Sequence, residues 1–239
     1  MIRIGIGGWN FPEWRGTFYP DGLPQRRELE FASRALTSIE INATYYGSQK
    51  PASFAKWRAE TPDGFVFALK GPRFATNRRV LAEAGDSVQR FIDSGIAELG
   101  DKLGPINWQF APTKKFDVDD FGAFLDLLPD AHAGVALRHA VEVRHESFHD
   151  PGFADLCRAR GVAVIRGADG SYPEIDADTA GFAYWRIMGT TDIPTGYPPK
   201  ALDDWAAQAK AVGKPLFLYV ISGAKQHNPA AAQALIARL

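Results

Sequence analysis

The chain has 239 residues, of which 46% are hydrophobic and 23% are charged, and its formal net charge is −1. This length is enough for one large core and is close to the roughly 250 residues of a usual (β/α)₈ barrel. The near-zero net charge argues against a general polyanion-binding surface, although it is compatible with a local basic patch.

The single cysteine and the short apolar runs narrow the class of protein further. Cys157 excludes an internal disulfide framework and argues against a cysteine-based metal site. No apolar run approaches the ~18 residues that a membrane span needs, and the apolar start of the chain is too short for a signal peptide. We therefore expect a cytoplasmic protein without a membrane partner.

Short apolar runs alternate with helical patterns along the whole chain. The expected strands cover residues 3–7, 37–46, 65–70, 105–110, 140–144, 162–166, 182–188 and 215–221. The expected helices cover residues 26–36, 51–60, 86–99, 118–128, 151–160, 200–212 and 229–239. The stretch 167–181 has turn chemistry, so the helix after the sixth strand is expected to be missing or irregular. This alternation predicts an α/β fold, a TIM-type (β/α)₈ barrel of parallel strands, with residues 1–239 as a single domain.

Polar side chains stand at the ends of the expected strands, where barrel enzymes carry their active sites. They are Glu40, Asn42, Tyr45, Lys70, Gln109, Glu142, Arg144, Arg166 and Arg186. Glu142 and Arg144 share one face of their strand because successive side chains point to opposite faces. We interpret these residues as a polar site at the carboxyl end of the barrel. The alternative is an internal network of charged residues that satisfy one another.

The carboxylates and the nearby cations supply the candidate catalytic groups. Glu40 and Glu142 could face each other across the barrel mouth, and either bind a divalent cation or divide into acid and base. Lys70 would neutralise charge, and His145 could act as a ligand or a proton shuttle. The five histidines form no helical His-x-x-x-His pair, so the sequence does not favour a divalent metal, and it identifies no cofactor.

Basic residues in the loops after the third, fourth and eighth strands predict a positive rim on the same face. They include Arg73, Lys114, Lys115, Lys225 and His227. Together with Arg144 and Arg186, whose planar donor groups suit phosphate and carboxylate, they predict an anionic ligand. A phosphorylated metabolite and a nucleic-acid backbone both fit, and the alternative is a set of solvated loop charges.

Aromatic residues gather after the first two strands. They are Trp9, Phe11, Trp14, Phe18, Tyr19, Tyr45 and Tyr46. Such side chains can stack on a sugar or a base, and they can also pack a loop against the barrel. On the first interpretation Trp9 and Tyr45 are binding residues, alongside Asn42 and Gln109.

Four stretches resemble the signatures of a known family, in the same order. They read IGIGGWNFPEWRGTFYP at 4–20, IEINATYY at 39–46, KLGPINWQF at 102–110 and EVRHESF at 142–148. The combination is similar to the YecE-like proteins, a family of unknown function, and this resemblance implies a TIM-type barrel. It implies no reaction, because the family has none assigned.

Three departures from that family pattern affect the expected site. Asn77 and Met188 stand where the resemblance implies histidines, and residues 222–228 replace an asparagine pair. The chain is therefore interpreted as a divergent branch. Either Lys225 and His227 substitute for the missing groups, or the ancestral activity is lost.

Two functions from different classes follow from these residues. The first is an enzyme, a hydrolase or an isomerase, acting on an anionic, phosphate-containing or nucleic-acid-related substrate at the carboxyl end of the barrel. The alternative is a non-catalytic module that binds a metabolite or a nucleic acid in the same basic pocket. The reaction, the substrate and the oligomeric state stay open at this point.

Overall fold

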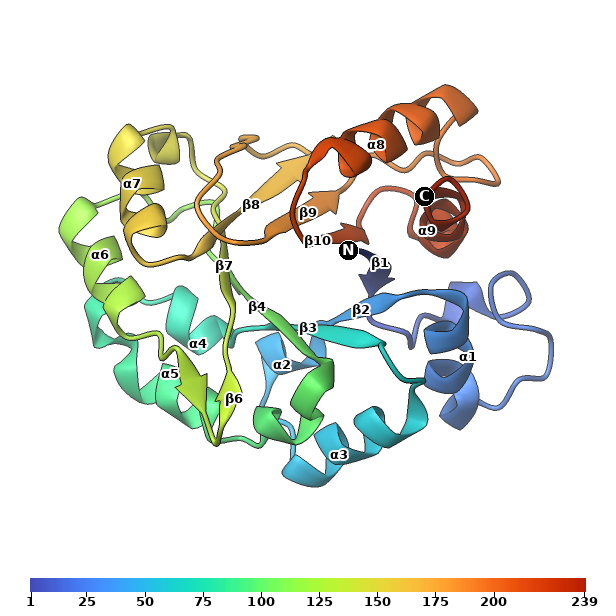
Figure 1. The fold of residues 1–239 in the computed structure, drawn as a ribbon, viewed down its shortest axis with the longest axis horizontal. Helices are drawn as coiled ribbons and strands as arrows, with labels where there is room; N and C mark the ends of the chain where they lie inside the picture. Colours follow the sequence, from blue (N-terminus) through green and yellow to red (C-terminus); the bar gives the residue numbers. More distant parts are fainter.

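Eight parallel strands close into a barrel in the computed structural model, which describes all 239 residues (Figure 1). The strands are β1 (Ile2–Gly7), β2 (Ser38–Ile41), β3 (Val66–Lys70), β4 (Leu103–Gln109), β7 (His139–Glu142), β8 (Ala163–Ala168), β9 (Ala183–Ile187) and β10 (Leu216–Val220). Their order around the barrel is β1-β10-β9-β8-β7-β4-β3-β2, so strands that follow one another in the chain are paired. The predicted TIM-type barrel of parallel strands is confirmed.

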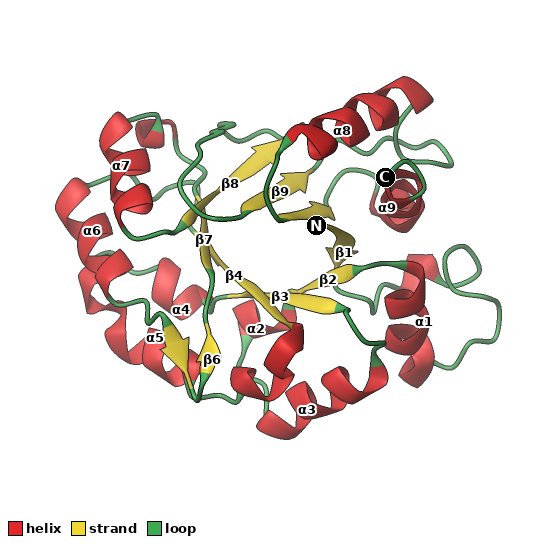
Figure 2. Cartoon of the chain, viewed as in Figure 1, coloured by secondary structure: helices red, strands yellow, loops and turns green.

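Helices surround the barrel (Figure 2). They are α1 (Glu28–Ala35), α2 (Ala43–Tyr46), α3 (Pro51–Glu60), α4 (Arg73–Thr76), α5 (Gly85–Ile92), α6 (Val118–Asp126), α7 (Pro151–Ala159), α8 (Pro199–Ala211) and α9 (Asn228–Ile236). Short 3₁₀ helices lie at Pro12–Trp14, Gln25–Arg27, Leu81–Ala84, Ile96–Lys102, Glu146–Phe148 and Lys225–His227. No helix lies between β8 and β9, as the turn chemistry there predicts. A small antiparallel hairpin, β5 (Ala131–His132) with β6 (Val135–Ala136), has no counterpart in the prediction.

Proline and aspartate residues fix where several helices begin. Pro51 and Pro151 stand in the first turn of their helices, where the missing N–H costs no hydrogen bond. Asp117 caps α6, because its Oδ1 accepts hydrogen bonds from the backbone N–H groups of Asp119 and Asp120 at 3.1 and 2.9 Å. These beginnings agree with the sequence signals.

The second strand ends earlier than predicted. β2 stops at Ile41, and Asn42 already has helical backbone angles, with φ −83° and ψ −21°. The hydroxyl of Thr44 donates to the carbonyl of Lys70 at 2.7 Å, which holds α2 against the end of β3. The predicted strand over 37–46 is therefore wrong in its second half, and Tyr45 lies in a helical turn at the barrel rim.

Two apolar cores support this arrangement. The larger one lies between the strands and the helices, and includes Trp108, Phe124 and Phe153. The smaller one fills the inside of the barrel, where Phe182 packs edge to face on Phe217 with ring centroids 5.9 Å apart. No helix of the chain has the length and apolar character that crossing a membrane would require.

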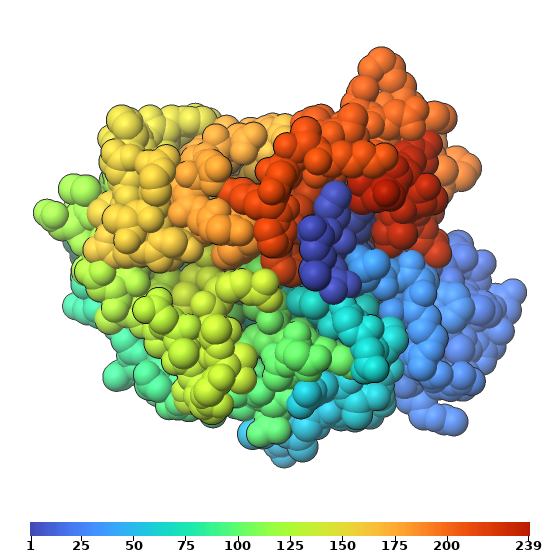
Figure 3. Space-filling model, viewed as in Figure 1, coloured from blue at the N-terminus to red at the C-terminus, as the bar shows by residue number.

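A layer of tyrosines separates the inner apolar core from the carboxyl ends of the strands. The rings of Tyr184 and Tyr219 have centroids 5.2 Å apart, and the Tyr219 hydroxyl forms a 2.7 Å hydrogen bond with the Ser38 hydroxyl. Seen from the side where the N-terminus lies, atoms fill the centre of the ring (Figure 3). The barrel is thus a packed core and not a pore, which leaves the carboxyl ends of the strands as the face for a site.

Candidate functional site

Five charged side chains from four strands meet at the carboxyl end of the barrel. This ionic cluster consists of Glu40 from β2, Lys70 from β3, Glu142 and Arg144 at the end of β7, and Arg186 from β9. All except Arg144 are buried, and Arg144 keeps 18% of its side chain exposed. The structure therefore brings together five of the residues that the sequence places at strand ends.

Arg186 joins the two carboxylates. Its Nη2 donates to Glu40 Oε1 at 2.9 Å, and its Nη1 donates to Glu142 Oε2. Burial alone would lower the pKa of Arg186, but the two carboxylates outweigh it and raise that pKa. Arg186 therefore compensates the buried charge of both carboxylates at once. Removing it would leave part of that charge uncompensated.

Glu142 is held in its ionised form. Its Oε1 accepts from Arg144 Nε and Nη2 at 2.8 and 2.7 Å, and its Oε2 accepts from Gln109 Nε2 at 2.8 Å in addition to Arg186. Burial raises the pKa of this carboxyl, but Arg186, Arg144, Lys70 and the Gln109 hydrogen bond lower it to about 2. At neutral pH the group has no proton to give.

Lys70 is the one cation of the cluster that forms no ion pair with Glu40 or Glu142. Its Nζ donates one hydrogen bond, to Gln109 Oε1 at 2.8 Å, and lies 4.4 Å from the centre of the Tyr45 ring. Burial, and then the nearby Arg186, lower the pKa of this amine to about 8 despite the two carboxylates. An ammonium has three donors, so Lys70 retains donors for a ligand.

Three further residues complete the cluster and were not predicted. Asn107 Nδ2 lies 3.3 Å from Glu40 Oε2 and 3.4 Å from Glu142 Oε2, and the Tyr184 hydroxyl donates to Glu40 at 2.5 Å. The ring of Tyr172 lies under the Arg144 guanidinium at 4.3 Å. Asn107 is two residues before Gln109 and Tyr184 is two before Arg186, so strand alternation could have found both.

Two loop residues of the expected site, Arg73 and His145, make no hydrogen bond or ion pair with the ionic cluster. The guanidinium carbon of Arg73 lies 5.9 Å from the centre of the Tyr46 ring and 5.5 Å from that of the Phe74 ring. His145 Nδ1 bonds the Ser147 hydroxyl and backbone at 2.9 and 3.1 Å, and no hydrogen bond or ion pair joins it to the cluster. Its Nδ1 is engaged by its own turn, and its role as a proton shuttle stays a prediction without a contact to the cluster.

The turn after β10 also differs from the expected site. His227 Nε2 pairs with the exposed Asp192 at 2.9 Å, and the Lys225 carbonyl accepts from the indole of Trp14 at 2.8 Å. Neither residue makes a hydrogen bond or ion pair with the ionic cluster. The substitution of these two residues for the groups that the family resemblance implies therefore stays a prediction.

Arg166 lies on the outer side of its strand, contrary to its expected place among the polar strand ends. Its Nε pairs with Glu174 at 2.6 Å, and its guanidinium lies 4.9 and 5.3 Å from the rings of Trp185 and Trp205. On β8 the inward positions are those of Ala163 and Ile165, which belong to the inner core. Arg166 is one residue out of phase with them, so it faces α8.

Trp9 and Asn42 line a different cavity from the ionic cluster. This cavity lies beside the barrel, and none of the five charged residues of the cluster lines it. No group of three or more histidine, cysteine, aspartate or glutamate side chains could hold a metal ion. A cation that used Glu40 and Glu142 would have to displace the guanidinium of Arg186.

The low pKa of Lys70 predicts a pH-dependent stability. The unfolded lysine titrates near 10.5 and the folded one near 8, so protons are lost from the folded state first and this group stabilises the fold as pH rises. Relative to Lys70→Met, the unmodified protein should gain about 2 kcal/mol of unfolding free energy between pH 7 and pH 9.5. Urea unfolding of both proteins at the two pH values measures this, and a constant difference would contradict it.

Two sequence comparisons match known proteins. The family model described as "Protein of unknown function DUF72" matches residues 3–239. The UPF0759 protein YunF of Bacillus subtilis (strain 168) is 27% identical over 117 residues, which span 47% of this chain but only 40% of that relative.

Crystal structures of two family members have the same fold. A DUF72 family protein from Thermotoga maritima has a TM-score of 0.78 at 22% identity, with 99% of this chain and 97% of that chain covered. One from Enterococcus faecalis V583 has a TM-score of 0.74 at 15% identity, covering 100% and 98%. With its barrel and with the family model matched from residue 3 to its last residue, the chain belongs to the DUF72 family, whose function is unknown.

Proposed function

We propose that the chain is an enzyme, a hydrolase or an isomerase, that acts on an anionic, phosphate-containing or nucleic-acid-related substrate at the carboxyl end of the barrel. The observation that carries this proposal is the charge balance of the ionic cluster. Lys70, Arg144 and Arg186 bring three cations against the carboxylates of Glu40 and Glu142. The cluster thus has one cation more than it has carboxylates, and a carboxylate or phosphate bound beside the partly exposed Arg144 would neutralise it.

Lys70 and Arg144 are the groups that would contact this anion. Lys70 has free donors, and Arg144 uses Nε and Nη2 on Glu142, which leaves Nη1 without a hydrogen bond. Arg144 is also the most exposed member of the cluster. A planar guanidinium beside an ammonium suits recognition of a carboxylate or a phosphate.

The proton-transfer role falls to Lys70 and not to Glu142. A group works best as acid or base when its pKa is near the operating pH, and the pKa of Lys70 is about 8. Glu142, with a pKa of about 2, instead fixes Arg144 and Arg186 in place and balances their charge. Glu40 has the same anchoring position on the other side of Arg186.

Turnover of a panel of anionic substrates tests this function. Phosphorylated sugars and nicked or abasic DNA would be incubated with the protein, with and without divalent cations. Lys70→Met should lower the activity found by about 100-fold, the usual loss for one preorganised donor, because it removes the amine that faces the substrate. Lys210→Met, on the exposed side of α8, is the matched control and should leave activity unchanged. An activity that survives Lys70→Met and Arg144→Ala unaltered would place the reaction elsewhere.

A non-catalytic binding module is the second candidate, and two observations favour it. Both carboxylates of the cluster are tied to Arg186, and the positions at which the family resemblance implies histidines carry Asn77 and Met188. On this alternative the same cations would bind a metabolite or a nucleic acid without turnover. This alternative predicts that the unmodified protein binds one of these molecules, that Lys70→Met does not, and that no product forms from any of them.

The narrower YecE-like assignment, and the place of the chain in a divergent branch, stay predictions.

A further inference from the structure

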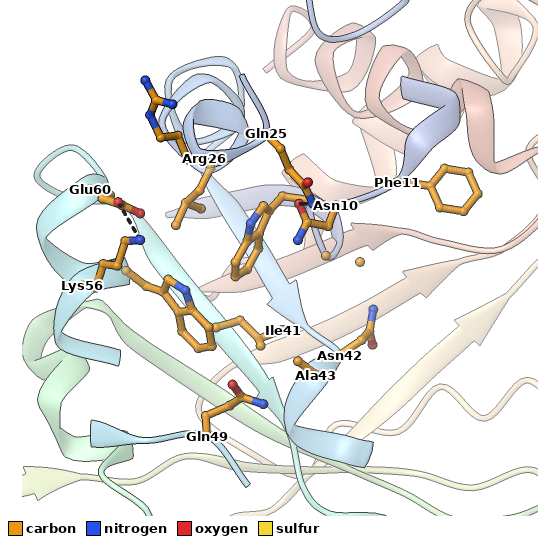
Figure 4. Close-up of a pocket in the computed structure, with 15 residues that line it drawn as sticks. Asn10, Phe11, Gln25, Arg26, Ile41, Asn42, Ala43, Gln49, Lys56 and Glu60 are labelled. Carbon is orange, nitrogen blue, oxygen red and sulfur yellow. Dashed lines mark hydrogen bonds and ion pairs between the residues drawn. The ribbon is translucent and has the colours of Figure 1, made fainter. Parts of the chain in front are cut away.

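A cavity of about 690 Å³ opens beside the barrel, between the loop after β1, the end of β2, the start of α1 and the helix α3 (Figure 4). Small-molecule sites in proteins usually measure roughly 300–1,000 Å³. The cavity shares no residue with the ionic cluster. It is therefore a second concave site, separate from that cluster.

Two indole rings form an apolar corner of this cavity. Trp9 and Trp57 meet edge to face, with centroids 5.3 Å apart and an angle of 79° between the rings. Trp57 also packs edge to face on the buried Phe54, with ring centroids 5.3 Å apart. Because the two rings are nearly perpendicular, they cannot enclose a flat base between parallel faces. Both indoles are only partly buried, so each retains surface that a ligand could contact.

Carboxamide side chains supply most of the polar lining. Asn10 and Gln25 lie on one side of Ile41 and Gln49 lies on the other (Figure 4). Their own hydrogen bonds are long: Gln25 Nε2 to Asn10 Oδ1 and Gln49 Nε2 to the Gly47 carbonyl both measure 3.4 Å. Each carboxamide carries a donor and an acceptor, which is also what a sugar hydroxyl requires of its partners.

The charges around the cavity do not favour an anion. Lys56 is paired with Glu60 at 3.6 Å, and Arg26 extends away from the carboxamides (Figure 4). The cavity therefore differs in kind from the ionic cluster, where cations are in surplus.

We propose that this cavity binds a neutral carbohydrate, with the C–H face of a pyranose ring on an indole and its hydroxyls on the carboxamides. The apolar corner accepts one face of the ring, and the carboxamides on opposite sides reach hydroxyls at its edge. The cavity volume accommodates a mono- or disaccharide. The proposal is independent of the function assigned to the ionic cluster, because the two sites have no residue in common.

Ligand-observed saturation-transfer NMR and calorimetry on the full chain test this site. The probes are glucose, xylose, N-acetylglucosamine, maltose and cellobiose, with adenosine and uridine as flat-ring comparisons. At least one sugar should bind, and Gln25→Ala and Gln49→Ala should each weaken it about fivefold, the affinity equivalent of about 1 kcal/mol. Gln233→Ala, on the exposed side of α9, is the matched control and should bind as the unmodified protein does.

Two further variants separate a ligand site from a structural role. Trp57→Phe keeps an aromatic ring against Phe54 but shortens the stacking face, so it should weaken the sugar while the thermal midpoint stays nearly unchanged. Lys70→Met should leave sugar binding intact, whatever becomes of the proposed activity. The proposal would be overturned if none of the five sugars bound, whether or not adenosine or uridine did. It would also be overturned if a sugar bound equally well to Gln25→Ala and Gln49→Ala.

Discussion

Replacing Arg186 by methionine should lower the free energy of unfolding by about 3–5 kcal/mol at pH 7, the usual cost of removing one partner of a buried ion pair. Arg186 lies between the fully enclosed carboxylates of Glu40 and Glu142 and donates to both. Methionine fills much of the space but carries no charge. Glu142 would keep Arg144, whereas Glu40 would lose its only ion-pair partner.

The loss should depend on pH in a defined direction. Without Arg186 the pKa of Glu142 rises from its value of about 2, so the variant accepts protons in the folded state more readily than the unmodified protein does. The stability difference between the two proteins should therefore shrink as pH falls from 7 to 5. Guanidinium unfolding at both pH values measures it. An equal difference at the two pH values would contradict an electrostatic origin.

Arg166→Met is the matched control for this experiment. Arg166 is also an arginine in a barrel strand, but it faces outward and pairs with Glu174, whose side chain is 43% exposed. Methionine can still pack on Trp185 and Trp205, so the variant loses the partly solvated ion pair with Glu174 and the exposed hydrogen bond from Nη1 to Gln208. The expected cost is below about 1 kcal/mol. A comparable loss in both variants would show that methionine is simply poorly tolerated in these strands.

Gly71→Ala should destabilise the fold by about 3 kcal/mol, near the upper end of the usual cost of overpacking. A Cβ on Gly71 would lie 2.3 Å from Cε3 of the Trp108 indole. That indole cannot move aside easily, because Phe91 and Phe124 pack on it at 5.7 Å and its Nε1 donates to His139 Nδ1 at 3.1 Å. The backbone must shift instead, and Lys70 is the adjacent residue.

Chemical denaturation and the pH titration of stability together measure this effect. Displacement of Lys70 should also change the gain in stability between pH 7 and pH 9.5. Gly85→Ala, at the start of α5, is the control, since its nearest neighbour is 3.6 Å away and alanine suits a helix better than glycine. A tolerated Gly71→Ala together with a destabilising Gly85→Ala would refute the steric argument.

The barrel itself could be predicted because its signals repeat. Each of the eight strands contains an apolar run, and the helices between them have recognisable first turns at Pro51, Asp117 and Pro151. The helical turn at 43–46 could not be predicted in this way. It exists because Thr44 reaches the carbonyl of Lys70, a contact between segments 26 residues apart.

Strand alternation predicts the part of the candidate site that lies on the barrel strands. Glu142 and Arg186 are indicated by their charge. Asn107 and Tyr184 share the barrel-facing phase of their strands, so the same alternation indicates them as well. The same rule excludes Arg166, which is out of phase with the inward Ile165. Tyr172 belongs to an irregular loop, so nothing local in the sequence indicates that its ring reaches Arg144.

The tyrosine layer beneath the ionic cluster has a consequence for kinetics. Tyr184 and Tyr219, with Phe182 and Phe217 below them, leave no passage toward the amino end of the barrel. A molecule bound at Lys70 could therefore not leave toward the amino end of the barrel. For the enzyme proposed above, substrate and product would share the carboxyl end of the barrel, and a product that stays bound would compete with the next substrate molecule.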